Sequence, residues 1–171
     1  ETLGTRGGTG EPALTTTATV SSAVGSYPIA AGQGTLASAN YTFSFQEGTL
    51  TVTPASLVVT PNDATRAYSS SNPVFSGTIT GIQNGDTITA NYTTTATISS
   101  PLGTYPITAT VNDPGSKLGN YAVTLNEGTL TVGKAVLIVR AEDKSRAYGS
   151  ANPTLTAGFT GFVNGETLAT S

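Results

Sequence analysis

The strongest constraint on this chain is an internal repeat. The segment NYTFSFQEGTLTV at residues 40–52 returns as NYAVTLNEGTLTV at residues 120–132, and RAYSSSNP at residues 66–73 returns as RAYGSANP at residues 146–153. Both pairs are offset by 80 positions (120 − 40 and 146 − 66), so the repeat unit is about 80 residues long. Tandem copies of one unit are typical of rods and arrays, whereas a single catalytic domain has no need to repeat itself.

The copies predict one complete repeat between two partial ones. Residues 55–134 form the central repeat, residues 1–54 match its later two-thirds (the first partial repeat), and residues 135–171 match its opening third (the last partial repeat). The letters ETL at residues 1–3 recur at residues 166–168, so both partial copies are cut at the same point. We therefore consider a donor-strand-like exchange in which one chain completes the next. A segment of a longer repeat protein explains the same pattern.

Composition excludes several classes of function. The chain has no Cys and no His, so it has neither a disulfide framework nor a thiolate metal site. Its net charge is −3 and its seven basic residues are spread along the chain, so we expect no nucleic-acid partner. No apolar run approaches the roughly 20 residues needed to cross a bilayer, so we expect no membrane span in this segment.

A catalytic site is not expected either. Without His and Cys, the remaining routes are paired carboxylates or a Ser/Lys arrangement. The acids, however, recur as copies: Asp86 and Glu166 both follow Asn-Gly, and Glu47 and Glu127 both precede GTLTV. Repeated acids in turns are most simply turn formers and solvated groups. We predict that the chain is not an enzyme.

Period-two patterns predict an all-β fold. In residues 49–53, Leu50 and Val52 share one face and three Thr share the other; in residues 56–60, Leu57 and Val59 share a face. Further predicted strands are residues 74–80, 87–98, 105–111, 121–125 and 136–140, separated by turn signals. This pattern favours tandem two-layer antiparallel β-sandwich modules of an immunoglobulin-like kind. The alternative is a β-grasp-like module, which requires a helix that no segment predicts.

The links between copies are short. At the first joint, only Thr53-Pro54-Ala55-Ser56 separates one strand pattern from the next, and at the second only Gly133-Lys134-Ala135 lies between Val132 and the next pattern. A flexible spacer would be a longer Gly/Ser tract. The proline at the first joint also restricts φ. We expect limited bending there, and more at the second joint, which has no proline.

The repeated segments resemble the MBG domain of the YGX type. RAYGSANP at residues 146–153, GFVNGE at 161–166, GTYPI at 103–107 and NYxxxxxEGTLTV at 120–132 follow the order and spacing of that family over essentially the whole chain. The resemblance implies a β-rich extracellular module of long bacterial surface and adhesin-like proteins, without a defined ligand. The signature positions, interpreted as structural, are Tyr68, Asn72, Pro73, Tyr105, Tyr121, Tyr148, Gly149, Asn152 and Pro153.

One signature position departs from the family pattern. Ser69 stands where the other copy has Gly149, so a left-handed backbone there would strain the serine but not the glycine. The tyrosines recur in register, which favours packing with the hydroxyl bonded to the backbone over stacking on a carbohydrate.

The sequence leaves open two further features, a Ca²⁺ site and N-glycosylation. Asn62-Asp63 and Asn112-Asp113 gather oxygen ligands, so Ca²⁺ is an alternative to their interpretation as turns. Asn40 and Asn91 begin N-x-Thr patterns for N-glycosylation, although chance matches are common in a Thr-rich chain.

The leading hypothesis for function is a structural one: an extracellular stalk or fibre segment on a bacterial cell surface that assembles with neighbouring repeats or chains, head to tail. The competing hypothesis is a binding module whose loops recognise a glycan or a host protein. Loops of equal chemistry, such as IQNGDT and FVNGET, would give avidity through many weak sites.

Overall fold

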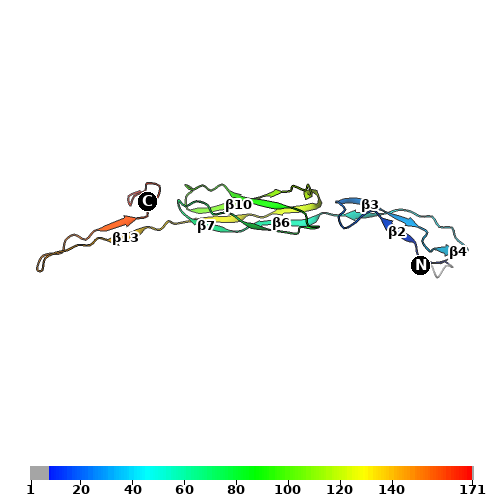
Figure 1. Ribbon diagram of the computed structural model, residues 1–171, viewed down its shortest axis with the longest axis horizontal. Helices are drawn as coiled ribbons and strands as arrows, with labels where there is room; N and C mark the ends of the chain where they lie inside the picture. Colours follow the sequence, from blue (N-terminus) through cyan, green and yellow to red (C-terminus); the bar gives the residue numbers. More distant parts are fainter. Residues whose placement is uncertain (1–7, 171) are drawn as a thin grey trace. The chain divides into compact units, whose positions relative to one another are not determined.

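The computed structural model describes residues 8–170, and strands joined by turns dominate it (Figure 1). The letters ETL at residues 1–3 and the opening of the first partial repeat lie outside the described residues. Within residues 8–170, the helical content is one 3₁₀ turn, Leu118–Asn120, and the helix of a β-grasp module is not present. The expected all-β fold is confirmed.

The strands divide among the three copies as follows. The first partial repeat holds β1 (Gly8–Thr9), β2 (Ala13–Thr16), β3 (Gly25–Gly32), β4 (Ala37–Ser38) and β5 (Gly48–Val52). The central repeat holds β6 (Ala55–Pro61), β7 (Ala64–Ala67), β8 (Gly77–Thr80), β9 (Thr89–Thr94), β10 (Gly103–Asn112), β11 (Tyr121–Leu125) and β12 (Gly128–Gly133). The last partial repeat holds β13 (Ile138–Ala141) and β14 (Ala157–Thr160).

The central repeat contains two sheets, of strand orders β7-β12-β10-β9 and β11-β6-β8. The chain leaves one sheet at Pro61 and enters the other at Ala64, so only two residues separate β6 from β7. β7 pairs with β12 in parallel, with Leu130 opposite Ala64. This pair departs from the purely antiparallel arrangement that the sequence predicted, because the chain changes sheets without a hairpin turn.

The core of the central repeat comes from facing strand positions. Leu57 and Val59 on β6 are fully buried, as their alternation predicted, and so are Ile107 on β10 and Leu130 on β12. Ile107 and Leu130 pack together with Ala96, and the partly buried Phe75 and Tyr92 lie against them, among others. Small, branched and aromatic side chains thus supply the apolar surface whose burial stabilises the repeat.

A glycine lies at a close approach of the two sheets. A Cβ added to Gly77 on β8 would lie 2.6 Å from the ring of Tyr92 on β9 and 2.6 Å from the Thr60 carbonyl oxygen. The two strands belong to different sheets of the central repeat. Glycine within a strand is typical of such a close approach.

The repeated sequence forms the same pairings in another copy. β3 pairs with β5 from Gly25↔Val52 to Ile29↔Gly48, and β10 pairs with β12 from Gly103↔Val132 to Ile107↔Gly128. The two registers are identical once the sequence offset is applied. In the first partial repeat the sheet order is β2-β3-β5, and in the last partial repeat β13 pairs with β14.

The strand predictions missed β7 and gave some other strands bounds that are too wide, as for β8 and β9. β7 was not predicted, because Arg66 interrupts its apolar pattern and is buried by hydrogen bonds instead. The strand predicted over residues 74–80 begins only at Gly77, and Val74 is 98% exposed. Arg66 is held by hydrogen bonds of its guanidinium group, which a hydropathy pattern does not report.

The chain divides into two compact units. The first holds residues up to 58 together with 80–89 and 112–124, and the second holds residues 59–79, 90–111 and those from 125 onward. The first unit contains the joint between the first partial repeat and the central repeat. The second contains the joint between the central repeat and the last partial repeat.

Candidate functional site: the joints between repeats

The signature segment RAYS is held by a buried arginine. Arg66 is 8% exposed; its Nε donates to Asn72 Oδ1 at 2.7 Å, and other guanidinium nitrogens donate to the carbonyls of Ala67 and Thr97. Asn72 Nδ2 in turn donates to the Ala96 carbonyl at 2.7 Å. Neutral oxygens thus accept the hydrogen bonds of this buried cation.

The last partial repeat forms the same bond. Arg146 Nε donates to Asn152 Oδ1 at 2.7 Å, although both residues are exposed there. The prolines that follow the asparagines, Pro73 and Pro153, are exposed in both copies. The Arg–Asn pair is therefore a property of the signature segment itself, present with or without a surrounding core.

The turn after the signature tyrosine has a left-handed residue. Gly149 has φ of 89° and Ser69 has φ of 61°, so both are left-handed, which is the condition under which the sequence implied strain at the serine. The Ser69 hydroxyl donates to Asn164 Oδ1 at 2.8 Å, across the second joint. The serine thus gains a contact that a glycine at this position would lack.

The second joint is closed by a tyrosine and a carboxylate. The Tyr68 hydroxyl donates to Glu166 Oε1 at 2.8 Å, and the Tyr68 backbone N–H donates to the Gly133 carbonyl at 2.7 Å. Glu166 follows the turn Asn164-Gly165, whose residues have φ of 53° and 73°. Hydrogen bonds to an ionised acceptor are stronger than neutral ones. Beside these contacts lies an open cleft of about 630 Å³, partly lined by Leu102, Leu137 and Phe162.

The first joint uses amide side chains. The Val24 backbone N–H donates to Asn120 Oδ1 at 2.9 Å, and Asn84 Nδ2 donates to the Val20 carbonyl at 3.4 Å. Asn84 and Asn164 are copies of one position, so the same Asn-Gly turn of each following repeat contacts the repeat before it. Neither this use of the turns nor the Tyr68–Glu166 pair was predicted from the sequence.

Tyr121 fixes the Asn-Gly turn inside the central repeat. Its hydroxyl accepts from the Gln83 N–H at 2.9 Å and donates to Asp86 Oδ2 at 2.7 Å. The ring is 7% exposed. Burial raises the pKa of Tyr121 above its ordinary value of 10.0, and the hydrogen bond to Asp86 raises it further.

This shift predicts a loss of stability in alkali. A tyrosine whose pKa is raised by folding contributes stability that is present below its ordinary pKa and lost as the pH rises through its folded pKa. We expect the unfolding free energy of the chain to fall above about pH 10, and Tyr121→Phe to remove part of that fall while lowering stability at pH 7. Urea denaturation at a series of pH values measures both effects.

The control for this prediction lies at the matching position. Tyr41→Phe alters a ring that is 57% exposed, so it should leave stability at pH 7 unchanged. Equal effects of the two substitutions at pH 7 would show that the Tyr121 contacts do not stabilise the turn.

The remaining signature tyrosines fall into two kinds. The Tyr105 hydroxyl donates to the Pro101 carbonyl at 2.9 Å, and its copy Tyr27 donates to the Ala23 carbonyl at 2.7 Å. Each bond closes the turn four residues before the ring. Tyr148, by contrast, is fully exposed, unlike its half-buried copy Tyr68.

The candidate calcium ligands take part in turns and strand ends. Asp63 Oδ1 accepts the Thr129 N–H at 2.7 Å, and Asn62 Nδ2 donates to Ser76 Oγ at 3.0 Å. Asp113 Oδ2 accepts the Leu118 N–H at 2.7 Å, and backbone N–H groups of Lys117 and Leu118 lower the pKa of Asp113. Within residues 8–170, no three acidic side chains are grouped so as to hold a metal ion.

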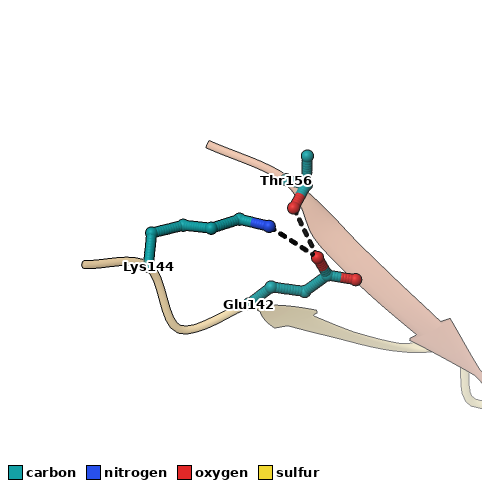
Figure 2. Close-up of polar contacts among 3 residues, drawn as sticks. All are labelled: Glu142, Lys144 and Thr156. Carbon is teal, nitrogen blue, oxygen red and sulfur yellow. Dashed lines mark hydrogen bonds and ion pairs between the residues drawn. The ribbon is translucent and has the colours of Figure 1, made fainter. Parts of the chain in front are cut away.

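The last partial repeat replaces the Asn62–Ser76 contact with a charged one. Figure 2 shows the Thr156 hydroxyl and the Lys144 ammonium converging on Glu142; the Lys144 Nζ lies 3.0 Å from Glu142 Oε2. The Thr156 hydrogen bond, followed by Lys144, lowers the pKa of Glu142. The copies keep a polar pair here but change its chemistry.

The two N-x-Thr asparagines are accessible. Asn40 is exposed near the end of β4, and Asn91 is exposed on β9 between the half-buried Ala90 and Tyr92. Mass spectrometry of native material would test whether either asparagine carries a glycan.

Among the described residues, no helix has the length and apolarity to cross a membrane.

One of the comparisons with known proteins finds the same three repeat copies. No curated protein and no solved structure shows significant similarity to the chain. The family model described as MBG domain (YGX type) matches residues 2–51, 57–131 and 137–171 in succession. The chain therefore belongs to the MBG domain (YGX type) family.

Proposed function

We propose that this chain is a structural stalk or fibre-forming segment of an adhesin-like bacterial protein, located outside the cell or on its surface. One observation carries the proposal: at both joints, neighbouring repeats bond to each other through side chains. The pair Tyr68–Glu166 is the clearest case. A stalk has to hold each repeat in a fixed position relative to the next. Direct contacts at each joint do this.

The covalent links support the same function. β5 ends at Val52 and β6 begins at Ala55, so two residues separate the strands at the first joint. Linkers that let domains move freely are longer and rich in Gly and Ser. The proline at position 54 also fixes φ within this link. Both features restrict the conformations available to the joint.

The alternative of a glycan-binding or host-protein-binding module gains less support. It relies on loops of equal chemistry that would act together, and the Asn-Gly loops are the best candidates. Asn84, Asn164 and Glu166 of these loops are hydrogen-bonded across the joints. The groups that would recognise a ligand are therefore already engaged. We assign no catalytic role, since the family is a non-catalytic repeat family.

Electron microscopy of native material tests this proposal. We expect unbranched rods or fibres with an axial period equal to whole repeats. Compact particles that bind members of a glycan array would instead favour the binding function and contradict the structural one.

A further inference from the structure

Two turns at the joints have the sequence Asn-Gly. Asn84-Gly85 lies in the central repeat and Asn164-Gly165 in the last partial repeat, and all four residues are exposed. Asn164 is exposed although the whole central repeat precedes it, and Asn84 is exposed although the rest of the central repeat follows it. The exposure is therefore a property of the turn in both copies, whatever lies beside it.

The backbone of these turns leaves the glycine N–H free. Asn84 and Gly85 have φ of 54° and 71°, and their copies have nearly the same values. The bond that closes the turn passes over the glycine, since the Asp86 N–H donates to the Gln83 carbonyl at 3.0 Å. Within residues 8–170, neither Gly85 nor Gly165 has a hydrogen-bond acceptor for its N–H. Each of these nitrogens is thus available for another reaction.

Open space surrounds both glycines. A Cβ built at Gly85 or at Gly165 meets no other part of the chain within 4 Å. To bring the glycine nitrogen against the Cγ atom of the preceding asparagine, the peptide between them has to rotate out of its left-handed conformation. No neighbouring group blocks this rotation, and glycine has no side chain to hinder it.

We propose that both Asn-Gly turns are sites of spontaneous deamidation in the folded chain. In the first, the backbone nitrogen of Gly85 attacks the Asn84 Cγ, and the Cγ–Nδ2 bond breaks. Nδ2 leaves as ammonia, carrying the proton of the glycine N–H, and a five-membered succinimide ring remains. Water then adds to one of the two carbonyl carbons of the ring and opens it. Opening at the main-chain carbonyl gives isoaspartate, and opening at the side-chain carbonyl gives aspartate.

This reaction weakens the contact across the first joint. Asn84 Nδ2 donates to the Val20 carbonyl at 3.4 Å. Once the amide is lost, a carboxylate oxygen faces that carbonyl, and neither group has a hydrogen to donate. The new negative charge also lies only two residues from Asp86, and like charges repel. Deamidation therefore replaces an attraction at this joint with a repulsion.

The second joint responds according to the product. Asn164 Oδ1 accepts the hydrogen bond of the Ser69 hydroxyl at 2.8 Å. An aspartate keeps this oxygen as an acceptor, and a charged acceptor binds the hydroxyl more strongly. Isoaspartate instead lengthens the main chain by one carbon atom and moves the carboxylate away from its former place. Only the isoaspartate product therefore breaks this bond.

Peptide mapping by mass spectrometry tests the proposal. The purified chain is incubated in mildly alkaline buffer, either folded or unfolded in urea, and digested at intervals. We expect the peptides that contain Asn84 and Asn164 to gain one mass unit in the folded chain. Asn40 and Asn91 are exposed asparagines followed by tyrosine, and they serve as internal controls. The two Asn-Gly sites should convert about tenfold faster than these controls, a difference of about 1.4 kcal/mol in activation free energy.

Asn84→Gln is the matched variant, because glutamine keeps the amide but has to close a six-membered ring, which forms far more slowly. It should abolish the mass gain at this turn and leave the gain at Asn164 unchanged. Conversion confined to the chain in urea would overturn the proposal, since the folded turn would then protect its asparagine. Equal rates at Asn84 and Asn91 would overturn it as well. Neither result bears on the stalk function, which electron microscopy tests separately.

Discussion

Leu130→Ala should lower the free energy of unfolding of the central repeat by about 2–5 kcal/mol, the range for large-to-small changes in a close-packed core. Leu130 has no exposed surface and packs against Ile107 and Ala96. Removing its side chain loses apolar burial and leaves a cavity that the two sheets can close only in part. Urea denaturation followed by circular dichroism measures the change.

The first partial repeat supplies the control for this prediction. Leu50→Ala changes the same residue at the same strand position, but Leu50 is 39% exposed. In dilute solution its cost should stay below about 1 kcal/mol, since less apolar surface is involved. Equal costs for the two substitutions would contradict the difference in burial between the two leucines.

Gly81→Ala should destabilise the chain by more than about 1–3 kcal/mol, the usual cost of a strained backbone position. Gly81 has φ of +95°, and a Cβ built there would lie 2.0 Å from the Ser56 carbonyl oxygen. An alanine at this position would have to adopt a backbone conformation that residues with a Cβ rarely take. Its methyl group would also displace β6. Its copy Gly161 has φ of +109°, with the Val136 carbonyl oxygen 2.5 Å from the same point.

Gly119→Ala is the matched control. A Cβ at Gly119 meets no atom within 4 Å, so this substitution should change stability little. Thermal melting of both variants gives the comparison. A Gly81→Ala melting temperature equal to that of the parent chain would show that β6 and the turn after β8 are not packed as described.

Repetition made much of the fold predictable from the sequence. The matching segments of two copies form the same strand register, and alternation predicted that Leu57 and Val59 would share a face. Local patterns of this kind report which face of a strand lies inside. The sequence also indicated that a left-handed backbone at Ser69 would strain the serine, because the other copy has a glycine at that position.

The joints could not be predicted in the same way. Tyr68 and Glu166 lie 98 positions apart, and each is a plausible surface residue when considered alone. Their contact depends on how one repeat follows the next, which neither periodicity nor turn chemistry encodes. β7 was missed for a related reason, since Arg66 is buried through hydrogen bonds rather than through apolar character.

Direct contacts hold neighbouring repeats together at both joints. Spin labels on cysteines introduced at Thr110 and Thr160, both exposed, give a distance distribution across the second joint. We predict a single narrow distribution in the parent chain that broadens when Tyr68→Phe and Ser69→Gly remove the bonds to Glu166 and Asn164. A broad distribution in the parent chain, unchanged by these substitutions, would show that these contacts do not hold the last partial repeat against the central repeat.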